Sequence, residues 1–121
     1  MNAETIREYC LAKKGITESF PFNEDVLVFK VGGKVYALID LSEPDSINLK
    51  CDPEYAIELR EKYEEVKPGY HMNKKHWNTV MINGALPVKM VYALIDHSYE
   101  QVVKGLGKKG AIFLHGRKNQ G

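Results

Sequence analysis

The residues best suited to bind or catalyse lie in one stretch, GYHMNKKHWNTV, at residues 69–80. It holds two histidines, two lysines and the only tryptophan of the chain, with no acidic residue. Lysines contact phosphates, aromatic rings stack on unpaired bases, and Asn or His hydrogen-bonds phosphates or base edges. This combination predicts a nucleic-acid-binding surface, although a solvated turn followed by a structural strand remains the alternative. The candidate nucleic-acid-binding residues are Lys34, Lys67, His71, Asn73, Lys74, Lys75 and His76, and the candidate structural anchors are Tyr70 and Trp77.

The same stretch does not have the spacing of a metal site. His71 and His76 are five residues apart, which is neither the helical i, i+4 pair nor the alternate-residue spacing of strand ligands. No Cys or carboxylate nearby in the sequence completes a ligand set. We therefore expect neither a metal nor a cofactor.

Catalytic motifs are also missing. The sequence contains no G-x-S-x-G, and Asp96, His97 and Ser98 are consecutive, so on a helix they point about 100° apart. We expect Asp96 or Ser98 to cap a helix, and we expect the protein not to be an enzyme. A weaker alternative is a ligand pocket near His71, His97 and Tyr99.

Composition and charge limit the classes of protein that this sequence can represent. A length of 121 residues suits one domain, and 44% hydrophobic with 27% charged residues is typical of a globular protein. No stretch approaches the ~20 apolar residues that cross a bilayer, and the N-terminal residues lack a secretory apolar segment, so a cytoplasmic location is expected. Cys10 and Cys51 each lie in an apolar pattern and are expected to be reduced and buried.

The net charge of +1 hides an uneven distribution. Residues 1–65 carry 8 basic and 14 acidic side chains, whereas residues 66–92 carry four lysines and no acid. Such asymmetry favours a polyanionic partner, unless acids of the first half neutralise these lysines in three dimensions.

Hydrophobic periodicity predicts the elements that must position these side chains. Gly32–Gly33 separates two β-branched runs as in a hairpin, with Val35, Ala37, Ile39 and Leu41 predicted on one face of the second strand. Asp52 and Pro53 form a helix N-terminus. Phe20 and Phe22 are expected to cover one edge of the core. The predicted elements are a helix at 2–14, strands at 26–31, 34–41, 47–51 and 76–82, a helix at 53–65, and a helical region from 86 that either continues unbroken or breaks near His97.

These elements predict an α+β fold: a two-layer sandwich with a mainly antiparallel sheet and helices packed on one face. A single domain is expected over residues 1–110. For the tail at residues 111–121, a short strand and partial disorder both remain open. A monomer is slightly favoured.

The order of motifs resembles the MmcQ/YjbR family over about residues 2–109. The resemblance rests on F-P-F, V-x-x-F-K-V-G-G-K-x-Y-A-L, I-N-L-K-C-D-P-E-Y-A, V-K-P-G-Y-H-M-N-K-K-H-W-N-T-V, G-x-L-P and L-I-D-H-S-Y-E-Q-V-V-K-G-L. It departs from the family pattern at Gly107, where Leu-Pro-Lys-Lys is usual, and in the tail after Gly110.

The resemblance implies a double-wing, CyaY-like α+β domain and a proposed DNA-binding role. The wings map to the hairpin around Gly32–Gly33 and to residues 70–84. The strand after the second wing is expected to be held to the core by Trp77, Val80 and Ile82. The alternative partner is a protein, bound by an adaptor or chaperone-like domain through an exposed apolar patch that does not bind nucleic acid.

Overall fold

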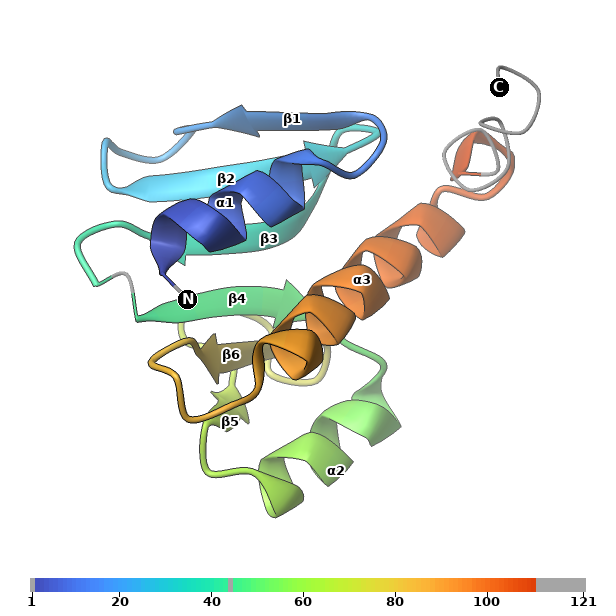
Figure 1. Cartoon of the computed structure of the whole chain (residues 1–121). Coiled ribbons are helices and arrows are strands. Elements are labelled where there is room, and N and C mark those ends of the chain that lie inside the picture. The colour runs from blue at the N-terminus through green and yellow to red at the C-terminus, as the bar shows by residue number, and fades with distance from the viewer. Residues whose placement is uncertain (1, 44, 111–121) are drawn as a thin grey trace.

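The computed structural model describes residues 2–43 and 45–110, so the expectations for the tail at residues 111–121 lie outside the described residues. Figure 1 shows the helices and the twisted sheet. The elements in chain order are α1 (Ala3–Leu11), β1 (Ile16–Ser19), β2 (Val26–Val31), β3 (Lys34–Asp40), β4 (Ser46–Lys50), α2 (Pro53–Lys62), β5 (Val66–Pro68), β6 (Trp77–Met81) and α3 (Val88–Gly105).

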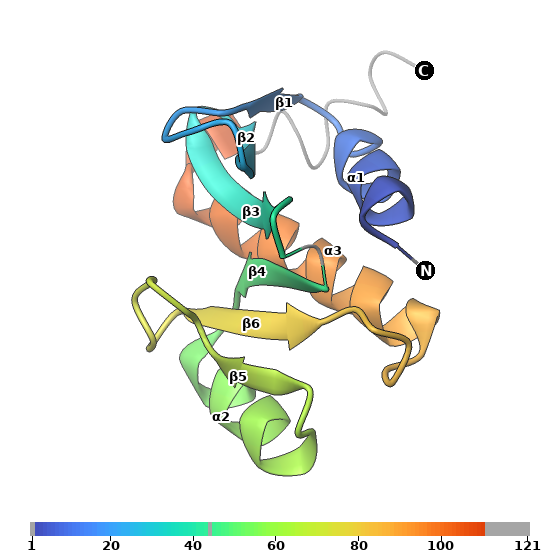
Figure 2. The ribbon, with the colours of Figure 1, turned by 90° about the vertical axis from the view of Figure 1, so that its left-hand side faces the viewer.

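All neighbouring strands in the six-stranded sheet are antiparallel, in the order β1-β2-β3-β4-β6-β5. The three helices contribute side chains to one core cluster with the inward face of the sheet. Figure 2 shows α1 and α3 on one side of the sheet, while the loops at residues 20–25 and 69–76 project from the other side. The predicted two-layer α+β sandwich is confirmed. We call the sheet face opposite α1 and α3 the open face.

The core follows from strand alternation and helix periodicity. In β2, Leu27 and Phe29 point toward the helices and are almost fully buried, and Ile47 and Leu49 do the same in β4. Asp52 caps α2 as predicted, since its side chain accepts a hydrogen bond from the backbone N–H of Tyr55. Both free cysteines are buried, as expected.

A β-bulge in β3 overturns one expectation. The pairing shifts between Phe29 and Lys30, so that Phe29 pairs with Ala37 but Lys30 pairs with Val35, and Tyr36 is the extra residue. Tyr36 therefore turns into the core, where its hydroxyl donates to the Cys10 carbonyl at 2.6 Å. Val35 was predicted on the face of Ala37, which is wrong because the bulge moves it to the open face.

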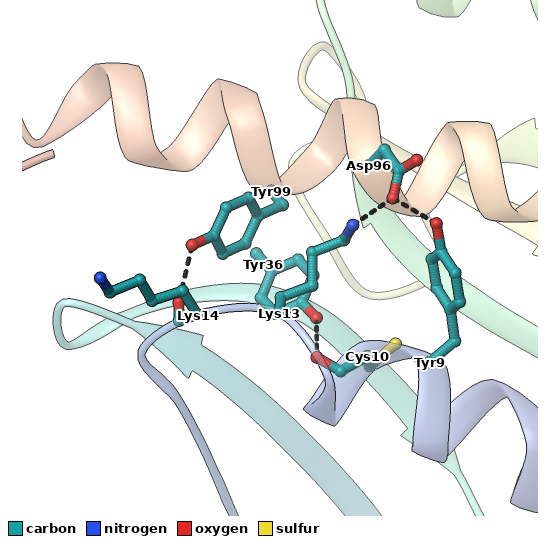
Figure 3. A network of polar contacts seen from close by, with 7 residues as sticks. All are labelled: Tyr9, Cys10, Lys13, Lys14, Tyr36, Asp96 and Tyr99. Carbon is teal, nitrogen blue, oxygen red and sulfur yellow. Dashed lines mark hydrogen bonds and ion pairs between the residues drawn. The ribbon is translucent and has the colours of Figure 1, made fainter. Parts of the chain in front are cut away.

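Helix α3 is continuous, and three adjacent residues fix it to the rest of the fold. Asp96 accepts a hydrogen bond from Tyr9 at 2.7 Å and forms an ion pair with Lys13 (Figure 3). His97 Nε2 accepts the Asp52 backbone N–H at 3.1 Å. Neither Asp96 nor Ser98 caps a helix, so that expectation is wrong.

Ser98 replaces a missing contact between two strands. Its hydroxyl donates to the Tyr36 carbonyl at 2.6 Å and accepts the Lys50 N–H at 2.8 Å. The β3–β4 pairing ends at Ala37 and Leu49, immediately before this point. Because the bulge separates the strands here, the serine hydroxyl bridges the two backbones. Asp96, His97 and Ser98 thus bind α1, the start of α2 and the sheet, in that order.

Other expectations need correction. Phe20 and Phe22 are 48% and 69% exposed and so do not cover a core edge. Leu41 follows β3 and is also exposed. The short strands β1 and β5 were not predicted, since each lies at an edge of the sheet and has only one neighbouring strand.

Candidate functional site

The two predicted wings lie at the same end of the sheet. The β2–β3 turn is at Gly32–Gly33, and the loop at residues 69–76 enters β6 at Trp77, which pairs with Lys50 at the end of β4. The Cys51 N–H donates to the His76 carbonyl at 2.7 Å, joining this loop to the end of β4. We call the end of the sheet that carries the Gly32–Gly33 turn, the end of β4 and the 69–76 loop the basic end. In Figure 1 it lies toward the right of the sheet.

Strand alternation places a row of side chains across the open face at the basic end. Lys30 pairs with Val35, and Lys50 pairs with Trp77, so β2, β3, β4 and β6 each contribute one residue. These four side chains are all half-buried. Lys34 begins β3 at the hairpin turn and is exposed, but it pairs with the core residue Val31, so its side chain starts from the helix face of the sheet rather than from the open face. Sequence reasoning did not select Lys30 or Lys50 as site residues, although the alternation of β2 and β4 already pointed both outward.

The C-terminal end of α3 adds further lysines to the basic end. A Cβ atom on Gly32 would lie 2.6 Å from Leu106 Cδ1, so the end of α3 packs directly on the hairpin turn. The exposed lysines near this contact are Lys104, Lys108 and Lys109.

The lysines of the basic end are not neutralised by described acids. Within residues 2–43 and 45–110, the ion pairs Arg7–Glu18 and Lys13–Asp96 both involve α1 or the turn after it. No described carboxylate forms an ion pair with Lys30, Lys34, Lys50, Lys67, Lys74 or Lys75. The alternative that acids of the first half neutralise this segment therefore loses support.

The loop at residues 69–76 is held by contacts that the sequence did not reveal. Arg60 of α2 donates from Nε to Asn78 Oδ1 at 2.7 Å. Its Nη2 donates to the Trp77 carbonyl at 3.2 Å and also to the Lys74 carbonyl. At Gly69 a Cβ atom would lie 2.8 Å from the Trp77 Cβ and 2.9 Å from the Trp77 carbonyl oxygen. Glycine is therefore required where the chain leaves β5, since its N–H bonds that same carbonyl at 2.8 Å.

Two of the predicted site residues stabilise the loop itself. Asn73 Oδ1 accepts the backbone N–H groups of Lys75 at 2.9 Å and His76 at 3.3 Å, which forms a side-chain-stabilised turn. Lys74 Nζ donates to the Gly69 carbonyl at 3.1 Å. Lys75 is exposed, and no side-chain bond of its own is found within the described residues. It is the loop lysine best placed to meet a ligand.

The two predicted structural anchors do not enter the core. Tyr70 is 69% exposed, and its ring centroid lies 4.1 Å from that of His71. Trp77 is half-buried on the open face, because Asn78 and Val80 point toward the helices and alternation turns Trp77 the other way. Val80 and the following Ile82 are the buried residues that hold this strand, as predicted for them.

A groove of about 1080 Å³ occupies the open face. Its walls are the loops at residues 20–25 and 69–76, which Figure 2 shows on the same side of the sheet. Phe22 lines one wall and Tyr70 and His71 line the other, while Leu38 and Thr79 are among the floor residues. Lys67 of β5 also lines the groove.

The groove is electrically asymmetric. Asp40, Glu43 and Asp45 line it at the end opposite the basic end. Hydrogen bonds from the hydroxyl and backbone N–H of Ser42 lower the pKa of Asp40, so this carboxylate is ionised at neutral pH. Lys67 and His71 lie on the other side of the groove. A phosphate is therefore favoured only toward the basic end.

The weaker alternative of a pocket near His71, His97 and Tyr99 is wrong. His71 lines the open face, whereas Tyr99 belongs to the core formed by the helices on the opposite face. Burial lowers the pKa of His97, which is engaged by the start of α2. Among the residues described, no three His, Cys, Asp or Glu side chains come together in a group that could hold a metal ion.

Comparisons with known proteins agree with this geometry. The YjbR family model matches residues 11–101. The chain belongs to the YjbR family. It is 35% identical over 104 residues to the uncharacterized protein YjbR of Escherichia coli K12, covering 85% of this chain and 88% of that protein. It is 37% identical over 107 residues to the uncharacterized protein YbdF of Escherichia coli O157:H7, covering 88% of each.

Solved structures of similar proteins show the same fold. The crystal structure of Deinococcus radiodurans protein DR2400, described with domain DUF419, has a TM-score of 0.83 and 39% identity, covering 89% of this chain and 83% of that one. A Pseudomonas syringae protein has a TM-score of 0.72 and 33% identity, covering 84% of this chain and 98% of its own. No described helix of the present structure is long and apolar enough to span a membrane.

Proposed function

We propose that this YjbR-family protein binds nucleic acid through the basic end of its sheet. One observation carries the proposal: lysines from three separate segments, the β2–β3 hairpin, β4 and the 69–76 loop, lie at this end of the sheet without a described acidic partner. They are Lys30 of β2, Lys34 of the hairpin, Lys50 of β4 and Lys75 of the 69–76 loop. This arrangement supports the proposal, because a cluster of basic residues from segments distant in sequence is the electrostatic footprint of nucleic-acid-binding proteins.

The proposed role is binding rather than catalysis, in the cytoplasm where nucleic acid is accessible. The adjacent Asp96, His97 and Ser98 are each occupied by a contact with a different element, so they do not converge on a substrate. The held loop also favours binding, since Arg60 fixes the backbone that presents Lys75. A positioned loop loses less conformational freedom when a ligand binds.

The test is fluorescence-anisotropy titration of labelled 20-nucleotide duplex and single-stranded DNA over a series of salt concentrations. The triple variant Lys34→Gln/Lys50→Gln/Lys75→Gln removes three positive charges from the basic end. Each lost phosphate contact should reduce the slope of log affinity against log salt by about 0.9 for duplex or about 0.7 for a single strand. Lys74 is left unchanged because it stabilises its own loop.

Lys89→Gln is the matched control, since Lys89 is exposed in the first turn of α3, away from the basic end. It should retain the wild-type salt slope. Absence of salt-dependent binding at low ionic strength would overturn the proposal. Weakening by Lys89→Gln that equals, per charge removed, the weakening by the triple variant would also overturn it, because the interaction would then follow net charge alone.

A further inference from the structure

The groove beside the basic end bears on which class of nucleic acid this surface would bind. We infer that this surface binds a single strand of DNA or RNA, with phosphates on the lysines of the basic end and unpaired bases in the open-face groove. The inference rests on the proposed function and names its ligand. The ligand is defined by two neighbouring features: the lysines of the basic end, and a concave surface with exposed aromatic rings.

The row formed by Lys30, Val35, Lys50 and Trp77 ends in an aromatic side chain. Lys50 pairs across the sheet with Trp77, and the Tyr70 N–H donates to Thr79 Oγ1 at 2.9 Å, which ties the exposed ring of Tyr70 to the strand that forms the groove floor. Alternating cationic and aromatic groups are how proteins hold single strands, since phosphates pair with the cations and bases stack on the rings. Bases in a duplex are already stacked and do not offer their faces.

The groove wall holds a ring pair in an unusual backbone conformation. His71 has φ 60°, and it is the described non-glycine residue with a left-handed backbone. A left-handed conformation costs roughly 1–2 kcal/mol for such a residue. The conformation places the His71 ring 4.1 Å from the Tyr70 ring, with 52° between their planes, and both rings line the groove. Strain that persists at a surface site is a reason to look for function there.

The groove floor offers oriented polar groups for base edges. Thr79 Oγ1 donates to Asn48 Oδ1 at 2.5 Å, and both residues line the groove. This bond fixes the Asn48 amide with its oxygen toward Thr79, so its NH₂ group is the part left to meet a ligand. Carboxamide groups bind base edges through such donors and acceptors. The volume of about 1080 Å³ matches the upper end of the ~300–1,000 Å³ of small-molecule sites, which gives room for bases rather than a duplex.

The charges that line the groove limit where a single strand of nucleic acid can lie. The carboxylates of Asp40, Glu43 and Asp45 line the far end. A polyanion is repelled there, so only the part of the groove near Tyr70 is available to nucleotides. This polarity separates the single-strand inference from an apolar peptide groove, which would use the aromatic side chains on both walls.

Two exposed aromatic residues give a matched test, because Tyr70 and Phe22 are each 69% exposed and line opposite walls. Fluorescein-labelled decamers of thymidine or uridine nucleotides and a 20-base-pair duplex are titrated with wild type, Tyr70→Ala, Tyr70→Phe and Phe22→Ala. Tyr70→Ala should weaken decamer binding about 5- to 100-fold, the range for losing a stacked base. Tyr70→Phe should restore it within about threefold, as the ring remains. Phe22→Ala and duplex binding by every variant should change less than twofold, about the limit for residues without a direct contact.

Each outcome decides between the two proposals. Duplex binding as tight as decamer binding, with no selective effect of Tyr70→Ala, overturns the single-strand inference but leaves the proposed function. Equal weakening by Phe22→Ala and Tyr70→Ala also overturns it, because the whole apolar groove would then be used. Absence of binding to every probe overturns the proposed function as well. Both residues are largely exposed, and circular dichroism verifies that the variants are folded.

Discussion

Replacing Ser98 by alanine tests how the sheet and α3 are joined. Ser98 is 0% exposed, and its hydroxyl bridges the Tyr36 carbonyl and the Lys50 N–H at 2.6 and 2.8 Å. Alanine fits the space but leaves both backbone groups without this partner. An unsatisfied buried polar group costs about 1–3 kcal/mol. The Lys50 N–H is only partly buried, so its contribution should lie in the lower part of that range.

The expected loss of unfolding free energy is therefore about 2–4 kcal/mol, with a fall in Tm on the order of 10 °C. Urea denaturation gives the free energy, and amide hydrogen exchange at Lys50 gives the local effect. Exchange of this amide should accelerate more than exchange of amides in the centre of β2. The same change should weaken nucleic-acid binding, since Lys50 belongs to the basic end.

Ser19→Ala is the matched control, because Ser19 is an exposed serine in the edge strand β1. It should change stability by less than about 0.5 kcal/mol. A similarly small effect of Ser98→Ala would refute the reasoning, as would unchanged exchange at Lys50. Either result would mean that the two strands hold together without the serine hydroxyl.

Three further predictions concern other contacts of the fold. Burial lowers the pKa of His97, so the stability that depends on its neutral form is complete above the unfolded pKa of about 6.5 and is lost as pH falls below it. Unfolding free energy should thus fall more steeply between pH 8 and pH 5.5, a range of about one to two units around that pKa, in wild type than in His97→Gln. Arg60→Ala should release the 69–76 loop, and a red shift of the Trp77 fluorescence should report it. Burial raises the pKa of Cys10 to about 12 and that of Cys51 to about 11, so both thiols should react slowly with an aromatic disulfide at neutral pH, Cys51 before Cys10.

Controls separate these effects from general destabilisation. An unchanged pH slope in His97→Gln would exclude His97 as the cause. Asp52 and Glu100 raise the pKa of His97 and Lys104 lowers it, so these three charges modulate the same titration. Arg7→Ala should leave the tryptophan emission unchanged, since Arg7 pairs with β1. Full thiol reaction within seconds in native buffer would contradict the buried positions, whereas rapid reaction in denaturant is expected.

The sequence predicts the layer arrangement because it depends on local periodicity. Alternation in residues 26–31 and 47–51 places Leu27 and Leu49 in the core, and the helical stripes of α1 and α3 face the same cluster. The edge strands β1 and β5 are less visible, since a strand of three or four residues is defined mainly by its neighbour. Pro68 in β5 further weakens any strand pattern.

The candidate site was predicted by residue type but not by orientation. Trp77 and Val80 are three residues apart, so in a strand they must lie on opposite faces, and the prediction that both hold the core was inconsistent with alternation. Val35 was misplaced because of the bulge at Tyr36, whose contacts with Cys10 and Ser98 are distant in sequence and give no local signal. Arg60 was missed because its partners lie 14 to 18 residues later, in the 69–76 loop and at the start of β6, and no local sequence pattern predicts such contacts.

The three adjacent contacts of α3 also restrict how the chain can change in length. Each added residue rotates everything downstream by about 100° and shifts it by about 1.5 Å along the helix. One insertion between Val88 and Ile95 would therefore displace Asp96, His97 and Ser98 together, separating α3 from α1, from α2 and from the sheet in a single step. The loop at residues 20–25 has no comparable set of contacts with three elements. Insertions there, which would reshape one wall of the groove, are consequently compatible with this fold, whereas insertions in the first half of α3 are not.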